Sequence, residues 1–331
     1  MRFGTFIPQG WRHDLVDIDP SEHWDTMRAL AQSADAGPWE SIWVYDHFHT
    51  VPAPTDQATH EAWTLMSAFA AVTERVRIGQ MCTCMSYRNP VYLAKVAATV
   101  DLISGGRTEM GIGGGWYEHE WRAYGYGFPG IGERLGRLRE GVDIMKQAWT
   151  TGEATLDGEY YQVSGAIVQP TPPQRGGIPI WVAGGGEKVT LKIAAQYADY
   201  TNFTGTLAEF DHKSAVLRGH CEAIGRDFDS ITRSSNFNTI VADTEAEVAE
   251  RINAVEARMA RHVGADVAAA YIHENYRSGS VAVGTPEQVI ERLQERKKHG
   301  LGYANHYFPE AAYDRATQQL FEQTVIPALA D

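Results

Sequence analysis

The chain has 331 residues, 44% of them hydrophobic and 21% charged, so it can bury a large core as one big domain or two modest ones. Its formal charge of -13 is spread along the chain, which argues against nucleic acid and anionic membranes as partners, because both attract basic surfaces. The three cysteines cannot form a disulfide framework, and the lack of a signal-peptide pattern or of an apolar run near the roughly 20 residues that span a bilayer predicts a cytoplasmic protein.

Short apolar runs alternate along the chain with longer stretches of helical period, the pattern of βα units around a parallel sheet. The predicted strands cover residues 3–8, 41–47, 76–83, 108–113, 178–184, 200–204, 236–242 and 303–309. The predicted helices cover residues 24–36, 63–73, 90–104, 132–149, 188–198, 207–224, 245–262 and 286–299. About eight units suit a barrel better than a doubly wound sheet, so we predict an α/β fold, the (β/α)8 TIM barrel.

Two stretches, residues 152–177 and 264–279, interrupt this alternation. In the first, Asp157-Gly158 predicts a hairpin turn and the prolines from Pro170 to Pro173 an extended return. The second has no clear period. Both are expected as excursions beside the active-site face of a single domain that covers residues 1–331, since no repeat or linker is visible.

The first candidate site lies where the strand at 41–47 ends in Asp46, His47 and His49. Because the carboxyl ends of barrel strands face the active site, Asp46 can orient His47 as a general acid or base. His47 and His49 also resemble the metal pair of barrel hydrolases. A packed or capping histidine is the structural alternative.

The second candidate is the strand end from Gly79 to Cys84, in which Met81 and Thr83 share one face and Cys82 and Cys84 the other. A lone C-x-C pair is a weak indication of a metal site, since no second ligand pair follows at a suitable spacing. Small residues that pack near a flat ligand or in the core are the favoured interpretation.

The third candidate is the run from Met110 to Glu120, where glycines are followed by aromatic residues, Glu118 and His119. Glycines allow the backbone to approach a ligand closely, whereas Trp116 stands where a dinucleotide-binding fingerprint needs glycine. A ligand site is the preferred interpretation, and a tight strand-to-helix turn is the alternative.

The fourth candidate is a strand followed by Gly184, Gly185 and Gly186 and then by Lys188. Free amides of such a loop, together with the positive end of a following helix, form an anion site. Phosphate is the natural occupant. A simple glycine-rich turn is the structural alternative.

Together these stretches resemble the luciferase-like monooxygenase superfamily, and within it the branch that uses coenzyme F420. The resemblance covers nearly the whole chain. It rests on SIWVYDHF (41–48), YRNPVYLAK (87–95), LISGGR (102–107), GIGGGWYEHE (111–120) and IWVAGGG (180–186). It implies a barrel of the bacterial luciferase type with insertions, and commonly a homodimer.

The resemblance also implies roles for single residues. By it, His47 lies beside the reactive ring edge with Asp46 as its neighbour, and Met81-Cys82 forms a bulge behind the ring, often with a non-prolyl cis bond. Thr83 and His119 match positions that hydrogen-bond the cofactor, and Gly184, Gly185 and Gly186 match the loop around its phosphate. The F420-dependent glucose-6-phosphate dehydrogenases of the family carry a Trp and a Glu where this chain has Val51 and Trp116, which argues against a sugar phosphate as substrate.

These features predict an F420-dependent oxidoreductase that moves a hydride between the deazaflavin and a small organic substrate, with His47 or Glu118 handling the proton. The near alternative is an FMN-dependent monooxygenase. A metal-dependent barrel hydrolase is less favoured, because the later strands offer no convincing further ligands, and no bound metal is expected. A non-catalytic flavin-binding protein remains the simplest alternative. Aromatic residues near the third candidate suggest an apolar or planar substrate.

Overall fold

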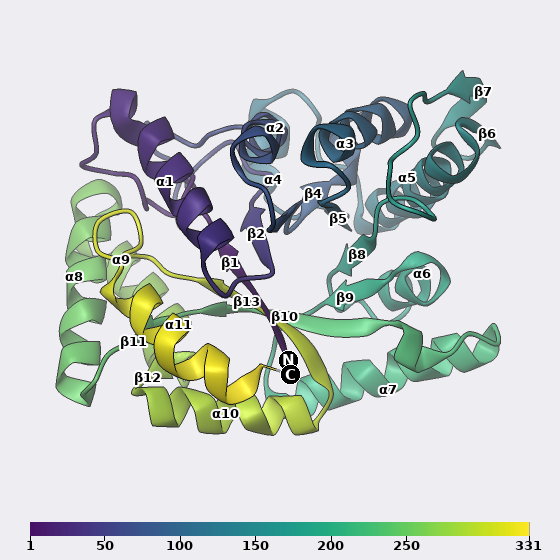
Figure 1. The fold of residues 1–331 in the computed structure, drawn as a ribbon. Coiled ribbons are helices and arrows are strands. Elements are labelled where there is room, and N and C mark those ends of the chain that lie inside the picture. Colours follow the sequence, from purple (N-terminus) through teal and green to yellow (C-terminus); the bar gives the residue numbers. More distant parts are fainter. Residues whose placement is uncertain (331) are drawn as a thin grey trace. The chain divides into compact units, whose positions relative to one another are not determined.

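The computed structural model describes residues 1–330, which divide into two compact units. The first unit combines Met1–Glu61 with the chain from Ser234 onward, and the second unit is Ala62–Arg233. Each unit contains parallel strands covered by helices (Figure 1).

The first unit is built on parallel strands whose residues are buried on both faces, as expected for a sheet covered by helices. Its strands are β1 (Arg2–Phe6), β2 (Ser41–Val44), β10 (Thr232–Asn238) and β13 (Leu301–Tyr307). They lie in the order β2-β1-β13-β10. Phe6 is aligned with Trp43, and Thr5 with His306, so the carboxyl ends of β1, β2 and β13 meet at one edge.

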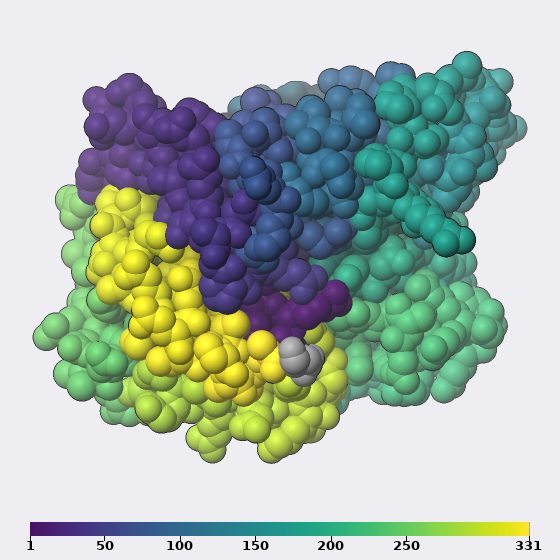
Figure 2. Space-filling model, viewed as in Figure 1, coloured from purple at the N-terminus to yellow at the C-terminus, as the bar shows by residue number. Residues whose placement is uncertain are grey.

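Four long helices belong to this unit. They are α1 (His23–Ala36), α8 (Glu245–Val263), α10 (Pro286–Lys298) and α11 (Ala316–Leu329). Helices α10 and α11 lie side by side, and their surface is visible in the space-filling view (Figures 1 and 2). The amino group of Met1 donates a hydrogen bond of 3.0 Å to the carbonyl of Leu329, so α11, which the sequence pattern did not predict, holds the start of β1.

The stretch 264–279, for which the sequence predicted no regular structure, is helical. It forms α9 (Ala265–Ile272) and one π-helical turn (His273–Arg277). Ile272 and Tyr276 pack into a cluster with residues of α8, and this buried contact fixes the helix where the sequence period is weak. The predicted strand 236–242 is also two strands, because β10 ends at Asn238 and β11 (Ile240–Val241) pairs with β12 (Val283–Gly284).

The second unit has its own parallel sheet. Its strands are β3 (Arg77–Gln80), β4 (Thr83–Cys84), β5 (Thr108–Gly113), β8 (Ile180–Ala183) and β9 (Tyr200–Asn202). Strand β5 is central, pairing with β3, β4 and β8, and β8 continues to β9. The predicted strand 76–83 is therefore interrupted between Gln80 and Thr83.

The helices of the second unit are α2 (Ala62–Val72), α3 (Pro90–Ser104), α4 (Glu118–Ala123), α5 (Ile131–Thr151), α6 (Thr190–Tyr197) and α7 (Leu207–Ala223). A hairpin of β6 (Glu153–Asp157) and β7 (Gln162–Ile167) packs beside α5 (Figure 1). Its loop is longer than the predicted two-residue turn, since Gly158 N–H bonds to Tyr161 O at 2.9 Å and residues 158–161 connect the strands. Short 3-10 turns cover Met85–Tyr87 and Phe228–Ser230 in this unit, and Pro20–Glu22 in the first unit.

Counting β3 and β4 as one interrupted strand, eight parallel strands alternate with helices along the chain, which confirms the predicted (β/α)8 barrel. The active sites of such barrels lie at the carboxyl ends of the strands. In the described part of the chain, no helix has the length and apolar character to cross a membrane.

Candidate functional site

His47 follows β2 in the first unit and lies flat against Trp11, which follows β1. The two rings are parallel, at 0°, with centroids 4.1 Å apart. Gln9 joins the two loops, because its side-chain oxygen accepts from Tyr45 N at 2.5 Å and its amide donates to Tyr45 O at 2.8 Å. Asp46, directly before His47 in the chain, is buried. The Trp11 ring therefore fixes the plane of the His47 ring, and the hydrogen bonds of Gln9 to Tyr45 hold the two loops together.

The loop after β1 has an unusual backbone. Gly10 has a φ of +97°, and a Cβ there would lie 1.8 Å from Ala58 O, so only glycine fits. His13 also has a positive φ, of 56°. Asp14 closes the loop by accepting hydrogen bonds from Gly10 N at 2.7 Å and from the Tyr307 hydroxyl at 2.9 Å. Burial raises the pKa of Asp14.

Sequence patterns did not single out this loop, although its Trp11 stacks on His47. The detectable signal was the run Trp11-Arg12-His13-Asp14 directly after an apolar strand, at the end that faces a barrel's active site. The Arg12 guanidinium lies against aromatic rings from three different strand ends. Those long-range neighbours are not visible in the sequence.

A metal centre at His47 and His49 has no structural support. Among residues 1–330, no group of three or more His, Cys, Asp or Glu side chains could hold a metal ion. The alternative of a metal-dependent hydrolase thus lacks a ligand set in this part of the chain.

In the second unit, the cis peptide bond expected at Met81-Cys82 is present. The bond lies where the chain passes from β3 to β4, and Thr83 follows it, buried, with its hydroxyl donating to Gln80 Oε1 at 2.9 Å. Cys82 is partly exposed and Cys84 is buried, and neither forms a disulfide.

The glycines of the third stretch serve packing between neighbouring strands. A Cβ at Gly111 would lie 1.9 Å from Gln80 O, and one at Gly113 would lie 2.8 Å from Cys82 Sγ. A Cβ at Gly115 would lie 2.6 Å from Cys84 Sγ. Close approach of β5 and the residues after it to residues 80–84 therefore requires glycine at these three positions.

We expect Gly111→Ala to lower the free energy of unfolding by about 1–3 kcal/mol, because the new methyl group overlaps a backbone oxygen that cannot rotate away. Denaturant titration measures this. Gly132→Ala is the matched control, since a Cβ at Gly132 meets no atom within 4 Å, and it should be neutral or slightly stabilising. Equal stability of the two variants would contradict the packing role.

Glu118 and His119 lie at the start of α4, and both are exposed. The Glu118 carboxylate accepts from Arg122 Nε at 2.7 Å, one helical turn later. Trp116, the first aromatic residue after the glycines, is 60% exposed. The second unit thus presents two titratable groups and an aromatic ring at its surface.

The fourth stretch has the form of an anion cradle. Gly184, at a φ of +111°, follows β8, and helix α6 starts at Thr190, two residues later than predicted. The glycine run is partly to fully exposed. Lys213 crosses it, since a Cβ at Gly185 would lie 2.8 Å from the Lys213 side chain. Glu187 is the opposing charge, and His212 pairs with it at 3.0 Å.

These features fit a phosphate-bearing cofactor. The loop offers exposed backbone, glycine at a position where a side chain would collide, and a lysine beside it. Most of the predicted contacts of the second unit follow or belong to β4 and β8, the two strands that flank β5, whereas His119 lies on α4. Within the first unit, His47, which directly follows Asp46 in the chain, stacks on Trp11.

Comparison with known proteins gives concordant results. A model of the luciferase-like monooxygenase family matches residues 1–303. An F420-dependent glucose-6-phosphate dehydrogenase of Kineococcus radiotolerans is 33% identical over 75% of this chain and 72% of that enzyme. An enzyme of the same description from Nocardia farcinica is 28% identical over 97% of both chains. The structure of monooxygenase RslO1 from Streptomyces bottropensis matches with a TM-score of 0.80 at 19% identity, over 100% of both chains.

Proposed function

Because the chain belongs to the luciferase-like monooxygenase family, we propose that it is an F420-dependent oxidoreductase that transfers a hydride between the deazaflavin and a small organic substrate. The choice of F420 is supported by relatives described as F420-dependent, one of which aligns over 97% of both chains. The structural observation that carries the proposal is the exposed glycine run beside Lys213, which suits the cofactor's phosphate.

When bound, the deazaflavin supplies a ring carbon that accepts or returns a hydride. The chain's own residues bind and orient. Amides of Gly184, Gly185 and Gly186 hold the phosphate, with Lys213 beside them. Met81, Cys82, Thr83 and His119 are proposed as contacts to the ring and its polar edge.

His47 is proposed to manage the proton. Removing a hydride from a substrate C–H bond leaves a proton on the attached hydroxyl, and the imidazole of His47 accepts it, or returns it when the reaction runs backwards. Trp11 holds the imidazole in one plane, and Asp46 precedes it in a buried position. Glu118 is the second candidate for this step, although its carboxylate is exposed and paired with Arg122.

We propose that this chain does not share the sugar-phosphate substrate that the names of its relatives describe. At the two positions where the family resemblance places a Trp and a Glu in those enzymes, this chain has Val51, which is buried, and Trp116, which is exposed. We propose a small organic substrate without a sugar phosphate.

We expect F420 to bind at least about tenfold more tightly than FMN. Titrating the purified protein separately with each cofactor, and following fluorescence, measures the two dissociation constants. Equal affinities, or tighter binding of FMN, would exclude this proposal in favour of the FMN-dependent monooxygenase.

The family resemblance also leads us to propose a homodimer in the cytoplasm, with residues 1–331 as one domain. Sedimentation velocity of the purified protein tests the dimer, and a monomer at micromolar concentration would contradict it. Fractionation of cells tests the location.

A further inference from the structure

Gln9 carries a buried amide that bonds to two other segments of the first unit. The residue is 1% exposed. Its Oε1 accepts from Tyr45 N at 2.5 Å, and its Nε2 donates to Tyr45 O at 2.8 Å and to His60 O at 3.0 Å. Since an amide side chain has one oxygen and two N–H donors, its oxygen and both donors are engaged. A buried polar group that is bonded in this way has little freedom to move.

The main chain of Gln9 adds a further bond, because Gln9 O accepts from His60 N at 3.0 Å. Gln9 therefore bonds to both the N–H and the C=O of His60, and to both of these groups of Tyr45. Main-chain bonds of this kind hold neighbouring strands in register. At the end of the β1–β2 pairing, Ile7 N donates to Trp43 O at 2.9 Å. The side chain of Gln9 extends this pairing by two residues along the chain after β2.

The amide of Gln9 fits in one orientation only. Turned over, its NH2 group would face the N–H of Tyr45, and its oxygen would face the carbonyl oxygens of Tyr45 and His60. All of these buried groups would then lack a partner of opposite polarity, which is unfavourable. The side chain therefore fixes how the loop after β1 lies against the loop after β2.

The stacked rings of Trp11 and His47 lie just beyond these bonds. Trp11 is two residues after Gln9, and His47 is two residues after Tyr45. On the other side of His47, Val51 N donates to Trp11 O at 2.9 Å. The segment that contains His47 is thus bonded to the loop after β1 at both of its ends.

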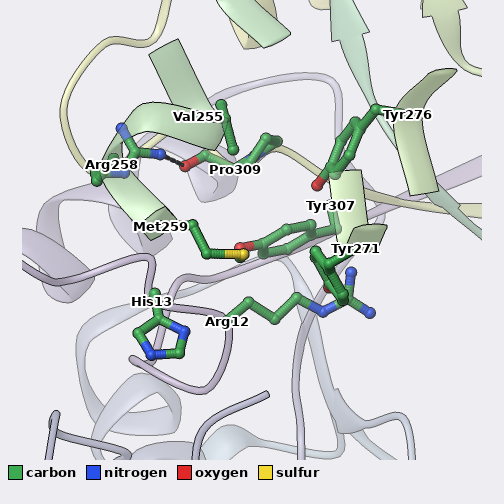
Figure 3. Close-up of a pocket in the computed structure, with 9 residues that line it drawn as sticks. All are labelled: Arg12, His13, Val255, Arg258, Met259, Tyr271, Tyr276, Tyr307 and Pro309. Atoms are coloured by element: carbon green, nitrogen blue, oxygen red, sulfur yellow. Dashed lines mark hydrogen bonds between the residues drawn. The ribbon is translucent and has the colours of Figure 1, made fainter. Parts of the chain in front are cut away.

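The loop after β1 is also held by β13, independently of Gln9. Asp14 accepts from the Tyr307 hydroxyl at 2.9 Å. Figure 3 shows Arg12 extended below Tyr307, and the Arg12 Cζ lies 4.5 Å from the centre of the Tyr307 ring. The cavity beside these two side chains has a free volume of about 10 Å³, enough for one water-sized group, so the packing is close. Loss of the Gln9 amide should therefore leave this loop in place and release the segment that carries His47.

We propose that Gln9 is a positioning residue, which holds the imidazole of His47 where it exchanges a proton with the substrate. Gln9 acts through the main chain of Tyr45 and through the placement of Trp11. That His47 moves a proton rests on the proposed function, whereas the hydrogen bonds of Gln9 belong to the first unit alone. Because a misplacement of about 1 Å can lower a rate by about 10²-fold, a side chain that fixes the imidazole supports the reaction without touching the substrate.

The test measures the position of the imidazole in the protein without cofactor. NMR spectra of the whole chain with isotope-labelled histidine report it, because an indole shifts the signals of a ring that is stacked on it. His47→Ala identifies the His47 signals, and Trp11→Ala gives their position without the indole. Gln9→Met keeps the length of the side chain and removes its three hydrogen bonds. It should move the His47 signals at least halfway from their parent position to their position in Trp11→Ala.

Thr317→Val is the matched control for loss of a buried hydrogen bond. Thr317 is buried on α11, and its hydroxyl donates to Glu310 Oε2 at 3.0 Å. The variant should lower stability to denaturant, yet leave the His47 signals where they are in the parent. If Gln9→Met moves these signals no further than Thr317→Val does, the proposal is wrong.

Gln9→Glu is the second variant, for the case that Gln9→Met does not fold, as judged by circular dichroism. It keeps the length of the side chain and the oxygen that accepts from Tyr45 N. It replaces the donor group by an oxygen that faces the carbonyls of Tyr45 and His60. The His47 signals should again move towards their position in Trp11→Ala, and parent positions would overturn the proposal.

Fluorescence titration of the same samples with F420 separates this proposal from the proposed function. The glycine run lies in the second unit, so the F420 affinity of Gln9→Met should stay within about threefold of the parent. A larger loss would make Gln9 part of the cofactor site and reject the positioning role. A parent that does not bind F420, with displaced His47 signals in Gln9→Met, would reject the proposed function alone. F420 binding in the parent with undisplaced signals in Gln9→Met would reject the role of Gln9 alone.

Discussion

His47→Ala should lower the turnover rate at saturating substrate by about 10²–10⁴, the range expected for loss of a general acid or base, while cofactor affinity stays within a few-fold of the parent. The imidazole follows a strand of the first unit and lies flat against Trp11, with ring centroids 4.1 Å apart. Removing it leaves the glycine run of the second unit unaltered. Binding and chemistry should therefore separate.

Three measurements on this variant distinguish the possible roles of His47. A higher cofactor dissociation constant with an unchanged saturated rate would mean that His47 only holds the ring. Joint loss of a bound metal and of activity would point to a metal ligand. His299→Ala is the control, because His299 precedes β13 and pairs with Glu295, at the opposite ends of the strands. An unchanged saturated rate in His47→Ala would remove it from the mechanism.

The regular part of the barrel was predictable because local signals and burial agree. Helix α3 was predicted with its observed bounds: Asn89 caps it by accepting from Val91 N and Tyr92 N, Pro90 starts it, and Gly105 ends it at a φ of +68°. Strand β5 was also predicted with its observed bounds, and all its residues are buried. Local patterns predict the bounds of an element correctly where its own sequence contains the residues that begin and end it.

The elements that were missed depend on distant contacts. The helical stretch at 264–279 has little period of its own and is held by Ile272 and Tyr276 against α8. Strands β10 and β11 were merged because the break between them, near Thr239, is set by pairing with β12 rather than by a glycine or proline. A single sequence contains no signal for such partners.

The candidate site was predictable only in its outline. His47 and the glycine run of the fourth stretch are adjacent to recognisable strand ends, so position alone marked them. The aromatic rings around Arg12 could not be assembled in the same way, because they come from the ends of three strands, β1, β2 and β13. That Gly111, Gly113 and Gly115 are required by contacts within the unit was likewise not visible in the sequence.

At the glycine run 184–186, the effects of added charge and of added bulk on cofactor binding can be measured separately. A Cβ at Gly185 would lie 2.8 Å from Cδ, Cε and Nζ of Lys213, so a side chain at this position displaces that lysine. An introduced carboxylate would also pair with the lysine and cancel its charge. The cradle would then lose its cation and gain an anion at the point where a phosphate is expected.

Gly185→Asp should therefore weaken F420 binding by about tenfold or more, since like charge and lost pairing act together. Gly185→Ala tests bulk without charge and should have a smaller effect. Gly219→Asp, at a site on α7 where a Cβ meets no atom within 4 Å, controls for the added charge and should leave affinity unchanged. Fluorescence titration measures all three, and circular dichroism should show a retained fold, because residue 185 lies in a loop. Affinity of Gly185→Asp within about twofold of the parent would show that the phosphate is held elsewhere.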